Sequence, residues 1–105
     1  MGRNNHSYTD EQIINYEEVK INLCQNMRIA RKLSNIKTKD AARKLGIEPE
    51  SLKRIESGSK VGPSLEVFCG AIELYNPEPN FYWKDWTNNQ KLLENKKVKE
   101  TSIVI

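Results

Sequence analysis

The stretch from Lys37 to Gly58 reads KTKDAARKLGIEPESLKRIESG and decides the fold. It predicts a short helix over 38–45, which Gly46 can end because glycine tolerates the left-handed conformation. Pro49 favours the first position of a second helix, over 49–57, since its missing N–H would have no helical partner there. Two short helices can pack at a steep angle around a tight turn when a small residue lies at their contact, and Ala42 supplies one. The stretch therefore predicts a helix-turn-helix unit at residues 38–57.

More helices are predicted on both sides of this unit. Upstream, Thr9 and Gln12 form a potential capping box, and an apolar stripe with helical spacing runs to Leu33. The pattern leaves open whether that segment is one helix or two helices joined near Ile21. The members of the stripe are Ile13, Tyr16, Val19, Leu23, Met27 and Ala30.

Downstream, Ser64 predicts the cap of a fourth helix, and Asn76 to Pro79 predicts its end. The expected inward stripe of this helix is Leu65, Phe68, Cys69, Ile72 and Tyr75. Thr87 and Gln90 form a second potential capping box, which predicts a polar fifth helix.

These elements predict an all-α fold, a compact bundle of about five helices with a C-terminal extension. A length of 105 residues suits one domain with one modest core. We expect a disordered lead-in over 1–8, a helix-turn-helix domain over 9–79, and an aromatic and helical extension over 80–105.

Charge is concentrated in the middle of the chain. Residues 20–62 hold 11 Lys and Arg against 4 Asp and Glu, a net +7, whereas the whole chain carries only +3. A basic block that coincides with a helix-turn-helix favours contact with the phosphates of DNA over an ordinary solvated helix face.

Several function classes lack support in the sequence. No Ser, His and Asp set or metal-ligating cluster can be assembled, and His6 is the only histidine, so we expect no enzyme, metal or cofactor. Cys24 and Cys69 have no partners at ligand spacing and are expected to be small buried residues in a reduced compartment. No signal peptide or membrane span is visible, which makes the cytoplasm the expected location.

The central segment resembles the helix-turn-helix family of phage repressors and Cro proteins. The resemblance extends over about residues 22–76, through Ala42, Gly46, Ile47, Arg54 to Gly58, and Pro63 to Glu66. It implies that the helix over 49–57 lies in the major groove of DNA, and that a homodimer reads an inverted repeat. It also implies a structural ion pair between Arg31 and Glu56, which stand at the positions of a paired arginine and glutamate in that family.

Helical geometry predicts the surface that would read DNA. With Leu52 and Ile55 facing inward, Glu50, Lys53 and Arg54 point outward, and Arg54 is the best candidate to read a guanine. Residues at the start of the helix over 38–45 and in the loop after Gly58 are expected to contact phosphates. The full predicted DNA-binding set is Lys37, Thr38, Lys39, Pro49, Glu50, Ser51, Lys53, Arg54 and Lys60.

Two carboxylates depart from the family pattern. Glu48 and Glu50 stand where small or amide residues are usual, and a carboxylate that faces DNA repels phosphates unless it accepts from cytosine or is neutralised. Glu50 could pair with Arg54, four residues on, and either aim or mask it. Equally, both glutamates could simply favour the helix dipole.

The sequence predicts a DNA-binding transcriptional regulator, specifically a repressor of phage or mobile-element type. The alternative is a protein-interaction module on the same fold, an antirepressor or antitoxin, with its partner on the C-terminal extension. There, Phe81, Tyr82, Trp83 and Trp86 suit the closing of a small core better than the stacking of bases. The apolar end, Ile103 to Ile105, suits a dimer strand, a partner-binding tail or a frayed end equally well.

Overall fold

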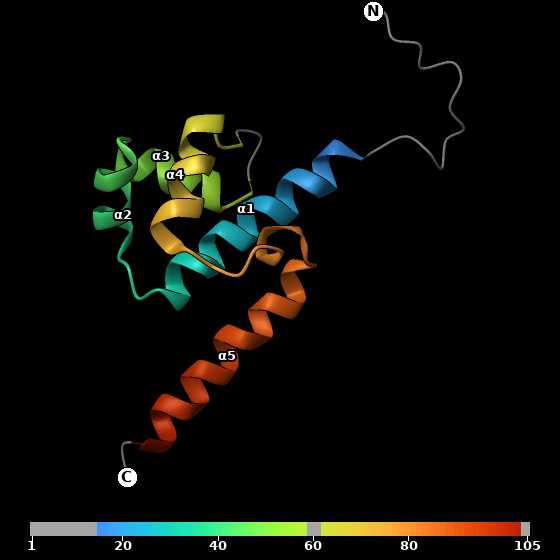
Figure 1. Ribbon diagram of the computed structural model, residues 1–105, viewed down its shortest axis with the longest axis vertical. Coiled ribbons are helices and arrows are strands. Elements are labelled where there is room, and N and C mark those ends of the chain that lie inside the picture. The colour runs from blue at the N-terminus through green and yellow to red at the C-terminus, as the bar shows by residue number, and fades with distance from the viewer. Residues whose placement is uncertain (1–14, 59–61, 104–105) are drawn as a thin grey trace, which may run out of the picture.

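Five α-helices and one short 3₁₀ helix make up the computed structural model, which describes residues 15–58 and 62–103, with side chains up to residue 97 (Figure 1). No strand occurs within these ranges, so the predicted all-α class with about five helices is confirmed. In chain order the elements are α1 (Tyr16–Leu33), α2 (Thr38–Leu45), α3 (Pro49–Glu56), α4 (Leu65–Tyr75), η3 (Phe81–Trp83) and α5 (Trp86–Ile103).

The α2 and α3 pair has the predicted boundaries to within a residue. Gly46 ends α2 with φ of 75°, a left-handed conformation that its lack of a Cβ permits. Pro49 is the first residue of α3, and Gly58, also at φ 75°, follows its end. Ala41 and Ala42 are fully buried, which allows α2 to approach its neighbours closely.

Helix α1 is continuous from Tyr16 to Leu33, which resolves the choice between one helix and two. Asn15 caps it, because its side-chain oxygen accepts from the N–H groups of Glu17 and Glu18 at 3.1 and 3.3 Å. The predicted capping box at Thr9 and the stripe residue Ile13 lie outside the described residues.

Only the C-terminal part of the predicted α1 stripe reaches the core. Met27 and Ala30 are buried, whereas Tyr16 is 77% exposed and Val19 49% exposed. The first turns of the stripe therefore do not reach the core, because α1 extends past the elements that pack against it (Figure 1).

The inward face of α4 also differs from the prediction. Ser64 caps the helix as expected, through its hydroxyl and the N–H of Val67 at 3.2 Å. However, Val67 and Ala71 are buried with Tyr75, whereas Leu65, Cys69 and Ile72 are exposed. The prediction that Cys69 is buried is wrong, and only Cys24 is buried as expected.

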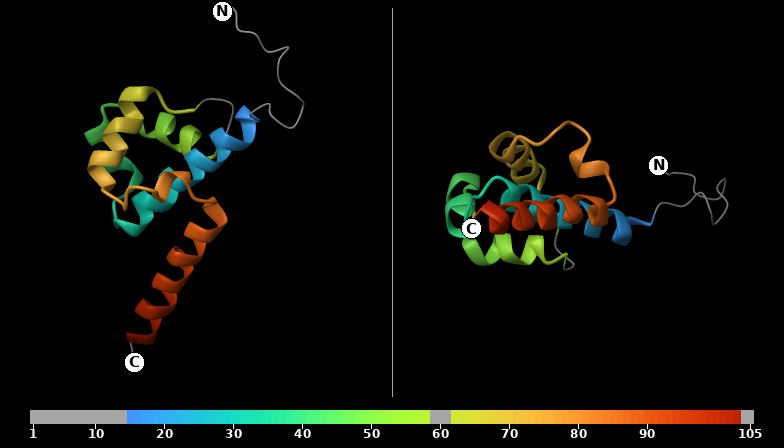
Figure 2. Two further views of the ribbon diagram at one scale, coloured as in Figure 1. Left: turned by 45° about the vertical axis from the view of Figure 1, so that its right-hand side comes forward. Right: turned by 90° about the horizontal axis from the view of Figure 1, so that it is seen from below.

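Helix α5 packs alongside α1 and runs in the same direction (Figures 1 and 2). Asn89 pairs with Asn26 near the start of the contact, and Lys96 donates to the Leu33 carbonyl at its end. The helix begins at Trp86, one residue before the predicted cap Thr87. Asp85 provides the cap instead, since its carboxylate accepts from the N–H and hydroxyl of Thr87 at 2.9 and 2.7 Å.

Within the described ranges, none of the helices is both long and apolar enough to cross a membrane.

Candidate nucleic-acid interface

Helix α3 has one buried face and one exposed basic face. Leu52 is fully buried and Ile55 is 6% exposed, so this edge anchors the helix to the core. Lys53 and Arg54 lie on the opposite, exposed face. The exposed face of α3 therefore carries two long cations that can contact a groove of DNA.

The carboxylate of Glu50 lies on the same exposed face. Its Oε1 is 3.5 Å from Nζ of Lys53, one helical turn further along, and both side chains are largely exposed. An exposed pair at this spacing contributes little to stability and can rearrange when a ligand approaches. Pro49 and Ser51 are half-buried at the edge of this face.

The start of α2 lies beside the start of α3. Lys37 is the N-cap of α2 and makes no side-chain capping bond, and Lys39 is exposed in the first turn. The first N–H groups of any helix lack helical acceptors, so this terminus favours an anion. A surface hollow of about 470 Å³ separates the two helices and is lined by Lys39, Asp40, Arg43, Ile47, Glu48 and Pro49.

Most of the predicted DNA-binding residues are accessible on the surface. Lys37, Lys39, Glu50, Lys53 and Arg54 are exposed, and Thr38 is half-buried. Lys60 lies outside the described residues.

Arg31 and Glu56 form a buried, two-pronged ion pair. Nε and Nη2 of Arg31 donate to the two carboxylate oxygens of Glu56 at 2.8 and 3.0 Å. Nη1 donates to the Ile36 carbonyl at 2.8 Å, and both side chains are less than a tenth exposed. The pair joins the end of α1 to the end of α3 and holds the exposed face of α3 in a fixed orientation.

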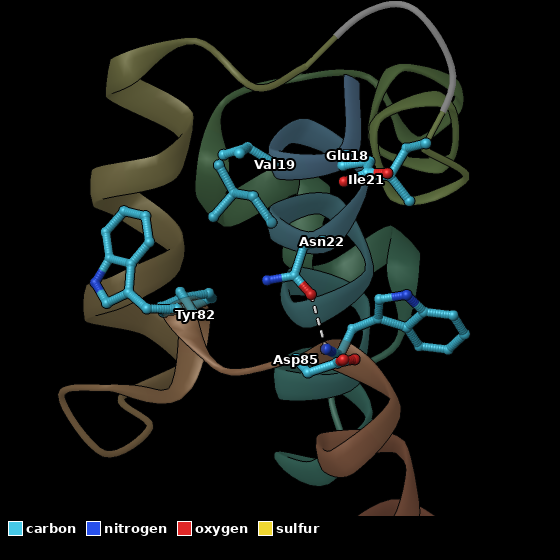
Figure 3. A pocket seen from close by; sticks show the side chains of 9 residues that line it. Glu18, Val19, Ile21, Asn22, Tyr82 and Asp85 are labelled. Carbon is cyan, nitrogen blue, oxygen red and sulfur yellow. Dashed lines mark hydrogen bonds between the residues drawn. The ribbon is translucent and has the colours of Figure 1, made fainter. Parts of the chain in front are cut away.

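A second hollow lies between the start of α1 and the segment from η3 to α5 (Figure 3). Its volume is about 620 Å³, and Val19, Ile21 and Trp83 give it apolar walls. The carboxylates of Glu18 and Asp85 lie at its rim, and Asn22 accepts a hydrogen bond at 2.7 Å from the N–H of Trp86.

The four clustered aromatic residues do not all lie in the core. Phe81 and Tyr82 are buried, and Tyr82 meets Phe68 edge to face with 5.2 Å between ring centroids. Trp83 is 65% exposed, and Trp86 is half-buried against the core. The expectation that the cluster closes a small core therefore holds for Phe81, Tyr82 and Trp86 and is wrong for Trp83.

Sequence reasoning missed the polar contacts that hold the segment from η3 to α5 against α1. Asn26 donates to the carbonyls of Tyr82 and Lys84 at 3.0 and 2.8 Å, and Asn89 donates to that of Phe81 at 2.9 Å. Asparagine at a helical position usually indicates an exposed site, so no signal in the sequence distinguished Asn26 and Asn89 from their exposed counterparts. Among the described residues, no group of three His, Cys, Asp or Glu side chains could hold a metal ion.

Comparison with protein families identifies the family of the central part of the chain. A family model described as Helix-turn-helix matches residues 27–76, from the buried part of α1 to the residue after α4. Comparison with curated proteins gives no match. Comparison with solved structures gives none either. Residues 27–76 therefore belong to the helix-turn-helix family of repressor and Cro type, a family of DNA-binding transcriptional regulators.

Proposed function

We propose that the protein binds double-stranded DNA sequence-specifically, as a transcriptional repressor of phage or mobile-element type. The observation that carries the proposal is the orientation of α3, whose buried edge is fixed by Leu52, Ile55 and the Arg31–Glu56 pair. This anchoring leaves Lys53 and Arg54 exposed on a rigid element. A rigid, exposed helix with long cations can enter the major groove and present hydrogen-bond donors to base edges.

Each site residue has a distinct role in this proposal. Arg54 reads a guanine through its guanidinium, and Lys53 contacts a guanine or a phosphate. Lys37, Thr38 and Lys39 hold a phosphate at the start of α2, and Lys60 holds another in the following loop. Pro49, Glu50 and Ser51 form the edge of α3 that enters the groove first.

We further propose that residues 9–79 form the DNA-binding unit and that the extension over 80–105 supports a homodimer on an inverted repeat. Helix α5 extends past the end of α1, and Leu92 on its surface is 51% exposed (Figure 1). A dimer doubles the contacts with DNA. Its two-fold symmetry predicts two half-sites one helical turn apart, about 34 Å.

Two substitutions test the docking of α3 on DNA. Arg54→Ala should cost about 1–3 kcal/mol of binding to a duplex that the wild type selects from a random pool, and should relax the choice of one base pair. Lys39→Ala should weaken binding to all sequences alike and lower the salt slope by about one. Lys91→Ala, an exposed position on α5, serves as the control. Unchanged binding in both variants would show that this docking is wrong.

A second candidate function is a protein-interaction module on the same fold, an antirepressor or antitoxin. The apolar hollow beside Trp83 favours it, as do the carboxylates of Glu48 and Glu50 on the face of α3. A salt titration with random duplex separates the two functions, because attraction to phosphates alone gives measurable binding at about 50 mM salt. Absence of any binding there would favour the interaction module.

A further inference from the structure

A third hollow lies between the end of α1 and the middle of α5. Its volume is about 360 Å³, and five of its lining residues are cations: Arg31, Lys32, Lys37, Lys96 and Lys97. Among the described residues that line it, none carries a carboxylate. Charges of one sign gathered in a hollow attract ligands of the opposite sign.

Arg31 and Lys96 are held in place by contacts within the protein. Arg31 is neutralised by Glu56, as described above. Nζ of Lys96 donates to the Leu33 carbonyl at 3.0 Å and to the side-chain oxygen of Asn35 at 2.7 Å. Both acceptors are uncharged, so Lys96 fixes α5 to the end of α1 and keeps its full positive charge in the hollow.

Lys32 shows that the charges in the hollow oppose one another. Partial burial lowers the pKa of Lys32, and the nearby charges of Arg28, Arg31 and Lys97 lower it further, while the charge of Glu56 offsets part of this shift. The folded chain thus holds Lys32, an exposed residue, close to other positive charges.

The hollow adjoins the start of α2. Lys37 lines it and is also the N-cap of α2, and Lys39, two residues on, lines the hollow between α2 and α3. The start of α2 therefore links the two hollows, although the carboxylates of Asp40 and Glu48 also line the one between α2 and α3. A phosphate backbone that reaches Lys37 meets Lys32 and Lys97 in the same hollow.

We propose that the hollow formed by Lys32, Lys37, Lys96 and Lys97 binds backbone phosphates of duplex DNA beyond the base pairs that α3 reads. The inference rests on the proposed DNA-binding function and extends its footprint to α5, outside the segment that matches the family. Lysine suits this role because it acts as a point charge on phosphate without requiring a particular base.

The test compares two double variants of the full chain on a long random-sequence duplex. Lys32→Ala with Lys97→Ala removes two charges from the hollow. Lys84→Ala with Lys91→Ala removes two exposed charges that do not line it, and so has the same net charge. Circular dichroism and a thermal melt show that each variant is folded.

The measured quantity is the slope of log Kobs against log salt concentration. Each lost phosphate contact reduces this slope by about 0.9, so the hollow variant should lose about two units and the control almost none. Equal losses in the two variants, or none in the hollow variant, would overturn the inference while leaving the proposed function intact. Failure of the wild type to bind any duplex would instead reject the proposed function.

A calorimetric titration with inorganic phosphate distinguishes DNA from a small anion as the ligand. We expect no saturable binding at millimolar phosphate, because one isolated phosphate engages only some of the lysines of the hollow. Saturable binding that is lost in the Lys32→Ala, Lys97→Ala variant would show that the hollow is a small-anion site and would overturn its assignment to duplex DNA.

Discussion

Asn26 on α1 and Asn89 on α5 form a hydrogen bond of 2.8 Å in the interior, and each is almost completely buried. Their remaining amide donors satisfy the carbonyls of Phe81, Tyr82 and Lys84. These carbonyls belong to η3 and its C-terminal flank, which lack the regular hydrogen bonding of a long helix. The two asparagines thus replace the backbone partners that the segment between α4 and α5 cannot supply itself.

Asn89→Ala should therefore lower the free energy of unfolding by about 2–3 kcal/mol. The substitution leaves the buried carbonyl of Phe81 and the side-chain oxygen of Asn26 without this donor. Urea denaturation followed by circular dichroism measures the loss. Asn95→Ala, an exposed position on the same helix, should stay within about 0.5 kcal/mol of the wild type. Equal stability of the two variants would contradict the role assigned to the pair.

The contrast between α2–α3 and the asparagine pair shows what a sequence can reveal. The boundaries of α2 and α3 follow from local rules, since Gly46 permits the left-handed conformation that ends α2 and Pro49 restricts φ at the first residue of α3. Asn26 and Asn89 are 63 residues apart, and nothing local distinguishes a buried asparagine from a solvated one. Their pairing depends on where α5 packs, which the residues near each asparagine do not determine.

The inward face of α4 could not be predicted for a related reason. Its sequence, LEVFCGAIELY, contains apolar residues all around the helix, so periodicity alone does not select one side. The structure selects Val67 and Ala71, since small side chains let α4 approach the other helices closely. In the candidate site, by contrast, Leu52 and Ile55 are the only large apolar residues of α3, and they fix its orientation without ambiguity.

Glu56→Ala should destabilise the fold by about 3–5 kcal/mol, because it leaves the guanidinium of Arg31 buried without a counter-charge. The double variant Arg31→Met, Glu56→Leu should recover much of this loss, since it removes both buried charges and keeps similar volume. Denaturation midpoints of the single and double variants measure the coupling. A double variant as unstable as Glu56→Ala would show that geometry, rather than the unpaired charge, dominates the loss.

Stability should decline above about pH 10 because of Tyr75. Burial raises the pKa of Tyr75 to about 12, and the nearby charge of Glu56 adds to the effect. An unfolded tyrosine titrates near pH 10, so between pH 10 and 12 the unfolded chain loses this proton first and becomes relatively favoured. Between these pH values, the loss of this proton from the unfolded chain lowers the free energy of unfolding by about 1.4 kcal/mol per pH unit.

Tyr75→Phe isolates this contribution. Among the described residues the buried hydroxyl of Tyr75 has no hydrogen-bond partner, so its removal should leave stability at pH 7 unchanged or slightly higher. Urea midpoints at pH 9, 10 and 11 should fall less steeply in the variant. Some decline should persist, since burial also raises the pKa of Tyr82. An identical pH dependence in both proteins would refute the assignment to Tyr75.

Glu50→Gln should raise the affinity for random duplex. In the structure, Glu50 is exposed on the face of α3 and lies 3.5 Å from Nζ of Lys53, so it opposes phosphates and competes with them for that lysine. Removing its charge frees Lys53 and eliminates the repulsion. The expected gain in affinity is about two- to fivefold at low salt, and it shrinks as salt screens the charges.

Glu66→Gln, at an exposed carboxylate in the first turn of α4, is the matched control for net charge. Fluorescence anisotropy over a salt series measures both variants. If Glu50→Gln instead loses affinity for one selected sequence and leaves random duplex unaffected, Glu50 accepts a hydrogen bond from a base, and the repulsive role is wrong.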